Sequence, residues 1–333
     1  MLLTTDWHLT DAPSEEYRWQ IFATLRAAIK QTKADHVFIL GDLTDRKDRH
    51  TGELVNRLVR EVRALTEICR QVTILRGNHD APLRGTPYWS FLSNFVGINF
   101  VVEPTWEAGG LLLLPHSVNP LEEWAELGLS KARAIFMHQT VNGAVGNNGH
   151  VLESDNAPLI PRGPLVYSGD IHVQQTVGRV TYIGAPHPIK FGDNYKLNIF
   201  ELDDSTFQVK RKLLVKSIAK LAITVSSLEE LRAVQTKPRD QVKVCFSLTI
   251  SAVAQWPAYK QAIIEWAAER QVEVASITTT VQDATRASSA SIGKLSILSN
   301  AEVLDTFSAS EQIDGDMLKT GHAFLKQAER AHA

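Results

Sequence analysis

The chain is predicted to be an α/β protein, because short apolar runs alternate with stretches that carry apolar residues at helical spacing. Two predicted helices, Glu15–Lys33 and Glu53–Cys69, separate the first apolar runs. Six runs are predicted as buried strands: Met1–Thr5, His36–Leu40, Val72–Arg76, Leu111–Leu114, Ala134–Met137 and Leu165–Ser168. This order of elements predicts a layered core of sheets and helices over residues 1–207.

A second, smaller α/β domain is predicted over residues 221–280. Its expected elements are the strand Leu221–Val225, the helix Leu228–Ala233, the strand Val242–Ile250, a helix that Pro257 opens, and the strand Val272–Thr279. Residues 208–220 between the two domains are basic, and we interpret them as a linker or exposed strand, with a phosphate-binding track as an equal alternative. Residues 281–333 are expected to form a loop over Gln282–Ser291 and a C-terminal amphipathic helix, Asp314–Arg330.

The composition is ordinary for a soluble globular protein of 333 residues, with 44% hydrophobic and 22% charged residues. No apolar run is long enough to span a bilayer, so no membrane association is expected. Cys69 and Cys245 form no close pair, which is typical of reduced thiols in a cytoplasmic protein. A net charge of −2 argues against a protein that coats nucleic acid, but not against one that binds it locally.

Polar clusters directly follow five of the predicted strands. They are Asp6-Trp7-His8, Gly41-Asp42-Leu43-Thr44-Asp45, Gly77-Asn78-His79-Asp80, His138, and Gly169-Asp170-Ile171-His172. In α/β sheets, the loops beyond the carboxyl ends of the strands are where sites assemble. Carboxylate, imidazole and amide side chains suit divalent transition metals such as manganese or iron. A single cluster would be weak evidence, but five in order predict a metal site.

These ligand types predict hydrolysis of a phosphate ester. An anionic phosphodiester resists attack by water, and a metal ion lowers the pKa of bound water from about 15.7 towards 7. A second metal about 3.5–4 Å away can share the resulting hydroxide and take up charge on the phosphate oxygens. Two such ions need a bridging ligand, and Asp42, held by the Gly41 turn, is the candidate.

The ordered motifs D-x-H, G-D-x-x-D, G-N-H-D, H and G-x-H resemble those of the calcineurin-like metallophosphoesterases, over the whole predicted first domain. Within that superfamily the chain is similar to the SbcD-type nuclease subunit of DNA double-strand-break repair, encoded by bacteria or phages. The D-W-H-L of Asp6–Leu9, the G-D-L-x-D of Gly41–Asp45, the R-G-N-H-D of Arg76–Asp80 and the stretch Tyr182–Asp193 carry this likeness.

The resemblance implies a DNA nuclease of a repair or recombination complex in the cytoplasm. It implies two divalent metal ions, with Mn²⁺ as the expected ion, and an SbcC-type ABC ATPase as partner. A homodimer is compatible with it. Two rival functions stay open: a phosphoesterase that acts on nucleotides or phosphoproteins, and a non-catalytic scaffold that binds DNA ends.

The resemblance also implies a role for each motif residue. One metal would be bound by Asp6, His8, Asp42 and His172, and the other by Asp42, Asn78, His138 and the residue at position 170. His79 would protonate the leaving oxygen or stabilise the pentacoordinate phosphorus, and Asp80 would orient His79. The family usually has a histidine where this chain has Asp170, which either ligates the second metal through oxygen or points away.

Residues outside the motifs give weaker predictions. Arg46, Lys47 and Arg49 lie next to a predicted ligand loop and are candidates for binding substrate phosphates, with a solvated loop as the equal alternative. His116 follows a predicted strand and either lines the cleft or, as the default, has a structural role. The apolar stripe on the final helix is expected to bind the ATPase or to dock on the second domain of the same chain.

Overall fold

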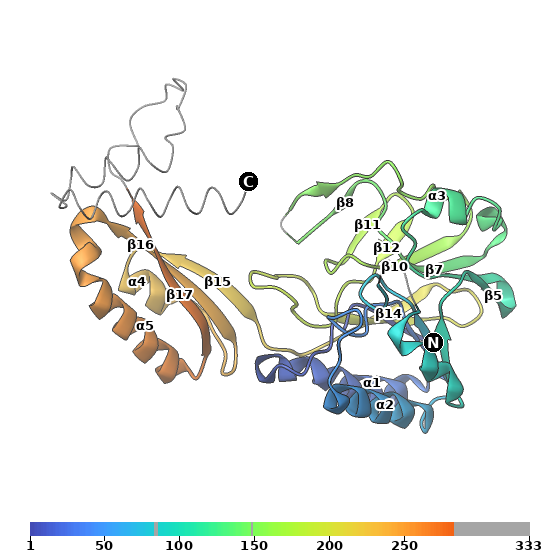
Figure 1. Cartoon of the computed structure of the whole chain (residues 1–333), viewed down its shortest axis with the longest axis horizontal. Coiled ribbons are helices and arrows are strands. Elements are labelled where there is room, and N and C mark those ends of the chain that lie inside the picture. Colours follow the sequence, from blue (N-terminus) through green and yellow to red (C-terminus); the bar gives the residue numbers. More distant parts are fainter. Residues whose placement is uncertain (83–85, 148, 283–333) are drawn as a thin grey trace, which may run out of the picture. The chain divides into compact units, whose positions relative to one another are not determined.

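The computed structural model describes residues 1–82, 86–147 and 149–282, without the side chains of Ile250, Ser251 and Gln282. Residues 1–282 form one compact unit (Figure 1). The predicted helix Asp314–Arg330 lies outside the described residues, as does all of the predicted loop Gln282–Ser291 except its first residue.

Two six-stranded sheets form the core of the larger predicted domain. The first has the order β14 (Val209–Leu214), β13 (Asn198–Leu202), β1 (Leu2–Thr4), β2 (His36–Ile39), β3 (Gln71–Leu75), β4 (Ile98–Val101). The second has the order β11 (Gln175–Val177), β12 (Val180–Tyr182), β10 (Leu165–Gly169), β7 (Ala134–His138), β6 (Leu111–Leu114), β5 (Thr105–Glu107). The strands β1 to β4 are parallel to one another, as are β6, β7, β10 and β12. All six strands predicted from the sequence are therefore confirmed.

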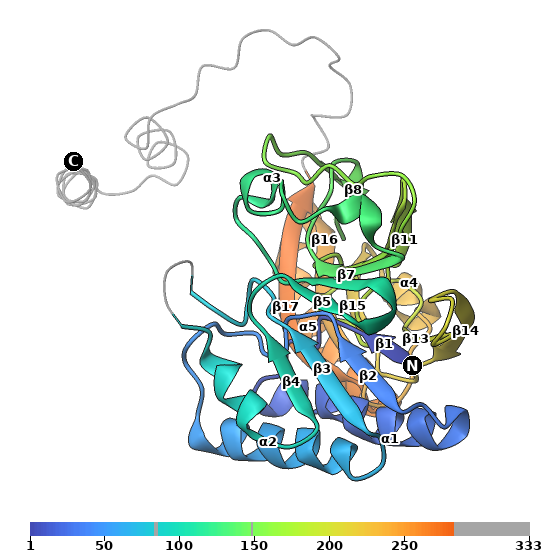
Figure 2. The ribbon, with the colours of Figure 1, turned by 90° about the vertical axis from the view of Figure 1, so that its right-hand side faces the viewer.

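The two sheets pack face to face. Apolar side chains of both sheets share one buried cluster, in which Phe38 of β2 meets Phe136 of β7 with ring centroids 5.0 Å apart. The helices α1 (Gln20–Thr32) and α2 (Gly52–Thr66) cover the other face of the first sheet (Figure 2). A short 3-10 helix, Pro13–Trp19, precedes α1, and the hydroxyl of Thr51 caps α2 by accepting from the amide of Leu54.

Short elements complete the core. They are the 3-10 turns Tyr88–Asn94, Ala108–Gly110 and Leu129–Lys131, the helix α3 (Pro120–Glu123), and the hairpin of β8 (Ala144–Val145) and β9 (Val151–Leu152). Trp124 lies in a further apolar cluster, on the outer face of the second sheet, and Leu129 packs against that cluster. The core therefore has helical segments outside both of its sheets, as the α/β fold class predicts.

The predicted second domain is a three-stranded parallel sheet with two helices. Its strands are β15 (Lys220–Val225), β16 (Gln241–Thr249) and β17 (Glu273–Gln282), and its helices are α4 (Leu228–Ala233) and α5 (Trp256–Arg270), the latter after a 3-10 turn, Ile250–Gln255. Phe246, Ile263 and Trp266 lie in an apolar cluster of its own. Strand β17 continues through Gln282, so the predicted loop cannot begin there.

Within residues 208–220, Val209–Leu214 form the edge strand β14, so the exposed-strand alternative is confirmed there. Edge strands tolerate charged side chains because one side of the strand faces solvent. Lys210 pairs with Asp203 at 3.0 Å, and Arg211 pairs with Glu201. These pairs favour the exposed-strand alternative over a phosphate-binding track. Among the described residues, no helix is both long and apolar enough to cross a membrane.

Candidate metal centre

The five sequence motifs converge where strands of both sheets end. Backbone hydrogen bonds hold the first two motifs together: Asp6 donates to the carbonyl of Gly41 and His8 to the carbonyl of Asp42, each at 3.0 Å. The third motif follows β3. In the second sheet, His138 is the last residue of β7, and the last motif begins with Gly169 at the end of β10. The carboxyl ends of parallel strands thus bring together side chains that lie far apart in the sequence.

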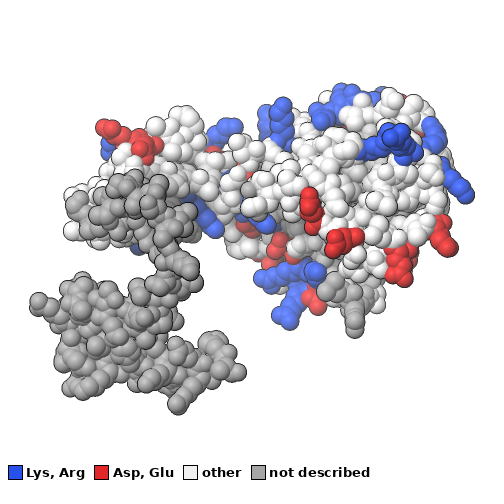
Figure 3. Space-filling model, turned by 90° about the horizontal axis from the view of Figure 1, so that it is seen from above, with Lys and Arg blue, Asp and Glu red and all other residues white. Residues whose placement is uncertain are grey.

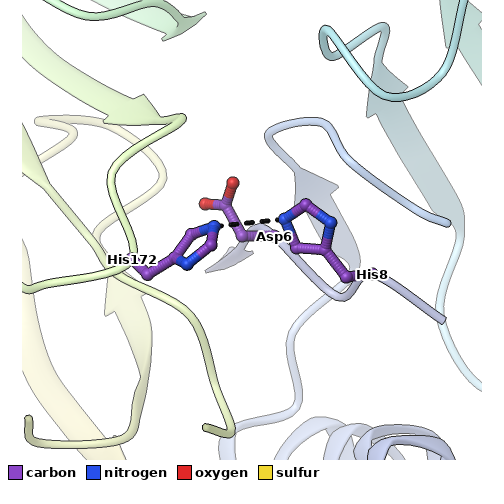
Figure 4. Close-up of side chains that lie close together, drawn as sticks. All are labelled: Asp6, His8 and His172. Carbon is purple, nitrogen blue, oxygen red and sulfur yellow. Dashed lines mark hydrogen bonds between the residues drawn. The ribbon is translucent and has the colours of Figure 1, made fainter. Parts of the chain in front are cut away.

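One group of possible ligands contains Asp6, His8 and His172 (Figure 4). The Nε2 atoms of His8 and His172 face each other at 3.1 Å, with the carboxylate of Asp6 beside them. One ligand atom from each of the three residues lies within 4.8 Å of the others. Asp6 and His8 are buried, so these donors are held away from bulk water.

Asp42 lies between two histidines. Its Oδ2 is 3.5 Å from Nε2 of His8, and its Oδ1 is 3.5 Å from Nε2 of His138. Asp6, Asp42 and His138 form a further group of ligand atoms within 4.8 Å of one another. The two oxygens of one carboxylate therefore face different parts of the cluster, as a bridging ligand requires.

His138 presents one nitrogen to this cluster. Its Nδ1 lies within hydrogen-bond distance of the carbonyl oxygen of Leu40, which can only accept, so Nδ1 carries a proton. With a metal in place of the proton on Nε2, this bond would make Nε2 the ligand atom. Nε2 lies 3.0 Å from the side-chain amide of Asn78. Metal-ligating histidines commonly have this second hydrogen bond, because it fixes the ring and its tautomer.

Three glycines make this close packing possible. A Cβ on Gly77 would lie 2.1 Å from Oδ1 of Asp42, and a Cβ on Gly169 would lie 2.1 Å from Oγ1 of Thr5. Gly41 has a φ of 99°, and a Cβ there would lie 2.3 Å from Nδ1 of His138. These positions exclude any side chain while the ligands keep their places.

Strained backbone also gathers at the centre. The non-glycine residues Asp6, His8, Asp42 and Asp170 have φ values of 51°, 44°, 56° and 77°. Each such residue costs about 1–3 kcal/mol and persists only where the surrounding structure enforces it. Four of them in one cluster are typical of a functional site.

The charges of the cluster fit bound cations. Burial raises the pKa of Asp6 to about 8, and Oδ2 of Asp6 is buried without a hydrogen-bond partner among the described residues. Burial alone would raise the pKa of Asp42, but the neighbouring His138 and His8 lower it below its usual value. Buried carboxylates of this kind need a compensating charge, and divalent cations supply it. Carboxylate, imidazole and amide donors are a suitable set for such ions.

The structure assigns Asp80 a contact that differs from the expected one. We expected its carboxylate to orient His79, but it accepts hydrogen bonds from the backbone amides of Asp42 at 2.8 Å, Leu43 at 3.0 Å and Gly77 at 2.8 Å. Asp80 ends a turn in which its amide donates to the carbonyl of Gly77 at 3.3 Å, so its side chain lies under the loop of Asp42. Asp80 therefore positions the loop that carries Asp42.

His79 is oriented by Asp45 instead. Its Nδ1 lies 2.7 Å from the carbonyl oxygen of Asp45, and its amide donates to Oδ1 of Asp42 at 2.8 Å. The ring packs edge-on against His8, with centroids 4.7 Å apart. This arrangement holds His79 beside the cluster, where it can act as an acid or as a further ligand.

Asp170 lies at the margin of the cluster. Its Oδ1 is 3.8 Å from Nε2 of His138, and its Oδ2 accepts from the hydroxyl of Thr140 at 2.5 Å. Its amide donates to Oδ1 of Asp6 at 3.2 Å. The carboxylate thus faces His138, although it belongs to none of the compact ligand groups.

The sequence did not point to two residues that hold predicted metal ligands in place, Arg18 and Thr140. The guanidinium of Arg18 is buried, and its Nη1 donates to the carbonyl of His8 at 2.5 Å while Nη2 pairs with Glu15 at 2.8 Å. Its position between two aromatic residues, Tyr17 and Trp19, in the first helical segment could have indicated that Arg18 is buried. Thr140, two residues after His138, gave no signal, because its partner Asp170 is 30 residues away.

The predicted substrate-binding residues lie next to the centre. Arg46 and Arg49 are exposed, and they follow Asp45, whose carbonyl holds His79. Lys47 is partly buried and lines a pocket together with Asn78. Their binding of substrate stays a prediction.

A family model for the calcineurin-like phosphoesterases matches residues 1–174, which include every predicted metal ligand. No curated protein matches the sequence. Among solved structures, the chain is similar to the nuclease MPE of Pseudomonas putida, with 19% identity, a TM-score of 0.29, and coverage of 64% of this chain and 71% of that chain. The family match spans more than half of the chain and contains the whole buried cluster. The chain therefore belongs to the calcineurin-like phosphoesterase family.

Proposed function

We propose that this phosphoesterase is a metal-dependent nuclease that hydrolyses DNA phosphodiesters. The observation that carries the proposal is the position of Asp42, whose two oxygens each lie 3.5 Å from a different histidine, His8 and His138. A carboxylate between two sets of nitrogen donors is the arrangement that a dimetal site needs.

The residues divide into two ligand sets that share Asp42. Asp6, His8 and His172 would hold one divalent cation with it, and Asn78, His138 and Asp170 the other. When bound, the cations would neutralise charge on the phosphate and lower the pKa of a water nucleophile. Mn²⁺ is the proposed ion, because histidine and amide ligands suit it better than they suit Mg²⁺.

The protein's own side chains would position the Asp42 loop and protonate the leaving oxygen. Asp80 keeps the loop of Asp42 in place through three backbone amides. Nδ1 of His79 donates its proton in a hydrogen bond to the carbonyl of Asp45. Nε2 of His79 is therefore the atom that can deliver a proton to the leaving oxygen. This assignment requires His79 to be protonated at the start of each turnover and to regain its proton from water.

DNA is proposed as the substrate on two grounds. The motif set resembles that of SbcD-type nucleases, and the loop of Arg46, Lys47 and Arg49 adjoins the cluster. On the face shown in Figure 3, the lysines and arginines of the described residues form separate groups with acidic side chains between them. Local contacts near the metal centre suit this pattern better than a long basic track.

A cellular role is part of the proposal. We infer that the chain acts in the cytoplasm in a DNA-end-processing complex with an SbcC-type ABC ATPase, and a homodimer fits such a complex. Deletion of residues 314–333 should leave cleavage of short DNA intact and abolish co-purification with the ATPase. Retained binding of the ATPase would place the interface elsewhere in the chain.

A substrate panel tests the activity. Full-length protein with Mn²⁺ should cleave DNA oligonucleotides and the diester bis-p-nitrophenyl phosphate, and Asp42→Asn should reduce both activities together. Nucleotides, a phosphopeptide and the monoester p-nitrophenyl phosphate should be poorer substrates. Faster hydrolysis of the monoesters would favour the rival nucleotide or phosphoprotein phosphatase, and DNA binding without any hydrolysis would favour the scaffold.

A further inference from the structure

A small pocket adjoins the metal centre on the side of Asn78. Its volume is about 140 Å³, and Lys47, Arg76, Asn78 and His116 are among the residues that line it. Pockets for drug-sized ligands start at about 300 Å³, so this one suits a single small group. The polar and basic lining indicates an anion.

The two walls of the pocket are fixed to different sheets. Arg76 follows β3 of the first sheet, and its amide donates to the carbonyl of Val101 at 3.0 Å. His116 follows β6 of the second sheet, and its amide donates to the carbonyl of Arg76 at 2.9 Å. The guanidinium of Arg76 also donates to the carbonyl of His116 through Nη2. These reciprocal bonds fix Arg76 and His116 to each other where the two sheets meet.

Part of the positive charge in this pocket has no partner. Nε of Arg76 is buried and makes no hydrogen bond within the described chain. The amine of Lys47 has no hydrogen-bond or ion-pair partner among the described residues. Of the described residues that line the pocket, Glu123 alone is acidic, and it is exposed. A buried donor without an acceptor costs free energy, and an anion would supply the acceptor.

The opposite side of the metal centre differs in charge. The pocket beside His172 is lined by Asp170 and Asp193 as well as Lys190. Asp193 already binds the backbone amides of Ile189 and Lys190. The pocket beside Asn78 therefore has an excess of basic side chains that the pocket beside His172 lacks.

We infer that Lys47, Arg76 and His116 form a phosphate subsite that binds the phosphate adjacent to the scissile one. The inference rests on the proposed function, because a neighbouring phosphate exists only in a substrate with more than one phosphate group. Arginine presents several N–H donors in a plane, which matches the oxygens of a phosphate, and lysine adds a point charge. The subsite would align a nucleic-acid strand across the metal centre, so that the reacting phosphodiester lies over Asp42.

Matched chromogenic esters test this subsite. The first pair is thymidine 5′-(p-nitrophenyl phosphate) with and without a 3′-phosphate, and the second pair is the reverse isomer with and without a 5′-phosphate. In one of the two pairs, the extra phosphate should raise kcat/KM of the unchanged protein about tenfold, the effect expected of a hydrogen bond to a charged group. Lys47→Met and Arg76→Met should each lower this ratio towards one.

Two further variants sharpen the test. Lys190→Met removes a cation from the opposite pocket and should leave the ratio unchanged. Glu123→Gln removes the acidic side chain at the rim of the subsite and should raise the ratio. A ratio near one for the unchanged protein in both pairs, or a ratio that Lys47→Met and Arg76→Met do not change, would overturn the inference.

A binding measurement separates this inference from the proposed activity. Calorimetry should show tighter binding of thymidine 3′,5′-bisphosphate than of either thymidine monophosphate, and Lys47→Met should remove the difference. If the esters and DNA are not hydrolysed but the bisphosphate preference is present and depends on Lys47, the proposed nuclease function fails and the subsite stands. If DNA is cleaved but the bisphosphate shows no preference, the subsite fails alone.

Discussion

Gly77→Ala should damage the metal centre through one contact. The added Cβ would lie 2.1 Å from Oδ1 and 2.5 Å from the backbone nitrogen of Asp42, while real Cβ contacts essentially never fall below 3.0 Å. Either the carboxylate of Asp42 or the backbone of the Asn78 loop must therefore move by about 1 Å. A displacement of about 1 Å at a reacting centre can lower the rate roughly 10²-fold.

The same substitution should have a limited effect on folding. Extra volume in a packed interior costs about 1–3 kcal/mol, so the variant should fold and melt at a lower temperature. The measurements are kcat/KM on a DNA oligonucleotide with Mn²⁺, metal content, and the melting temperature. We expect a rate about 10²-fold lower and weaker binding of metal.

Gly52→Ala is the matched control. A Cβ at Gly52, in the first turn of α2, has no atom within 4 Å. Alanine is also the better helix former, so this variant should keep full activity and equal or slightly higher stability. If Gly77→Ala retained activity and metal binding within twofold of Gly52→Ala, the packing argument for the Asp42 loop would be wrong.

Four further outcomes follow from the cluster. His79→Ala should slow cleavage by about 10²–10⁴-fold with metal content near two ions per chain, since a general acid is lost; loss of the metals would show that His79 is a ligand. Asp170→Ala should weaken one metal only, and Asp170→His should restore its binding with altered metal preference; full occupancy of both metals in the alanine variant would remove Asp170 from the ligand set. Mn²⁺ should support cleavage much better than Mg²⁺, which prefers oxygen ligands; equal activity with Mg²⁺ alone would count against this ligand set. Burial raises the pKa of Asp6 to about 8 from 3.8, so folded metal-free protein keeps a proton that the unfolded chain releases. Its melting temperature should therefore decrease as the pH rises from about 4 to 8, and bound metal should remove this trend; a flat profile after chelation would contradict the charge assignment.

The strands and motifs could be predicted because their signals are local. Each predicted strand of the core is a run of buried apolar residues, and each motif follows such a run directly. The convergence of Asp6, His8, Asp42, His138 and His172 followed from a general property of parallel strands, whose carboxyl ends meet at one edge.

Other features depend on contacts between distant residues. Strand β14 carries three consecutive basic residues, Lys210 to Lys212, and its place at the edge of the first sheet is set by pairing with β13. The carboxylate of Asp80 was assigned to its sequence neighbour, His79, whereas the fold directs it to amides 37 and 38 positions away. Arg18 reaches the carbonyl of His8 only because the first helical segment folds back over the β1 loop.

The central claim is that two metal ions share Asp42. The most direct measurement is electron paramagnetic resonance of the full-length protein with two equivalents of Mn²⁺. The unchanged protein should give the spectrum of an exchange-coupled pair, and Asp42→Ala should lose that coupling, whereas the exposed-loop variant Arg49→Ala should keep it. A spectrum of isolated Mn²⁺ ions in the unchanged protein, or binding of only one ion per chain, would contradict the account.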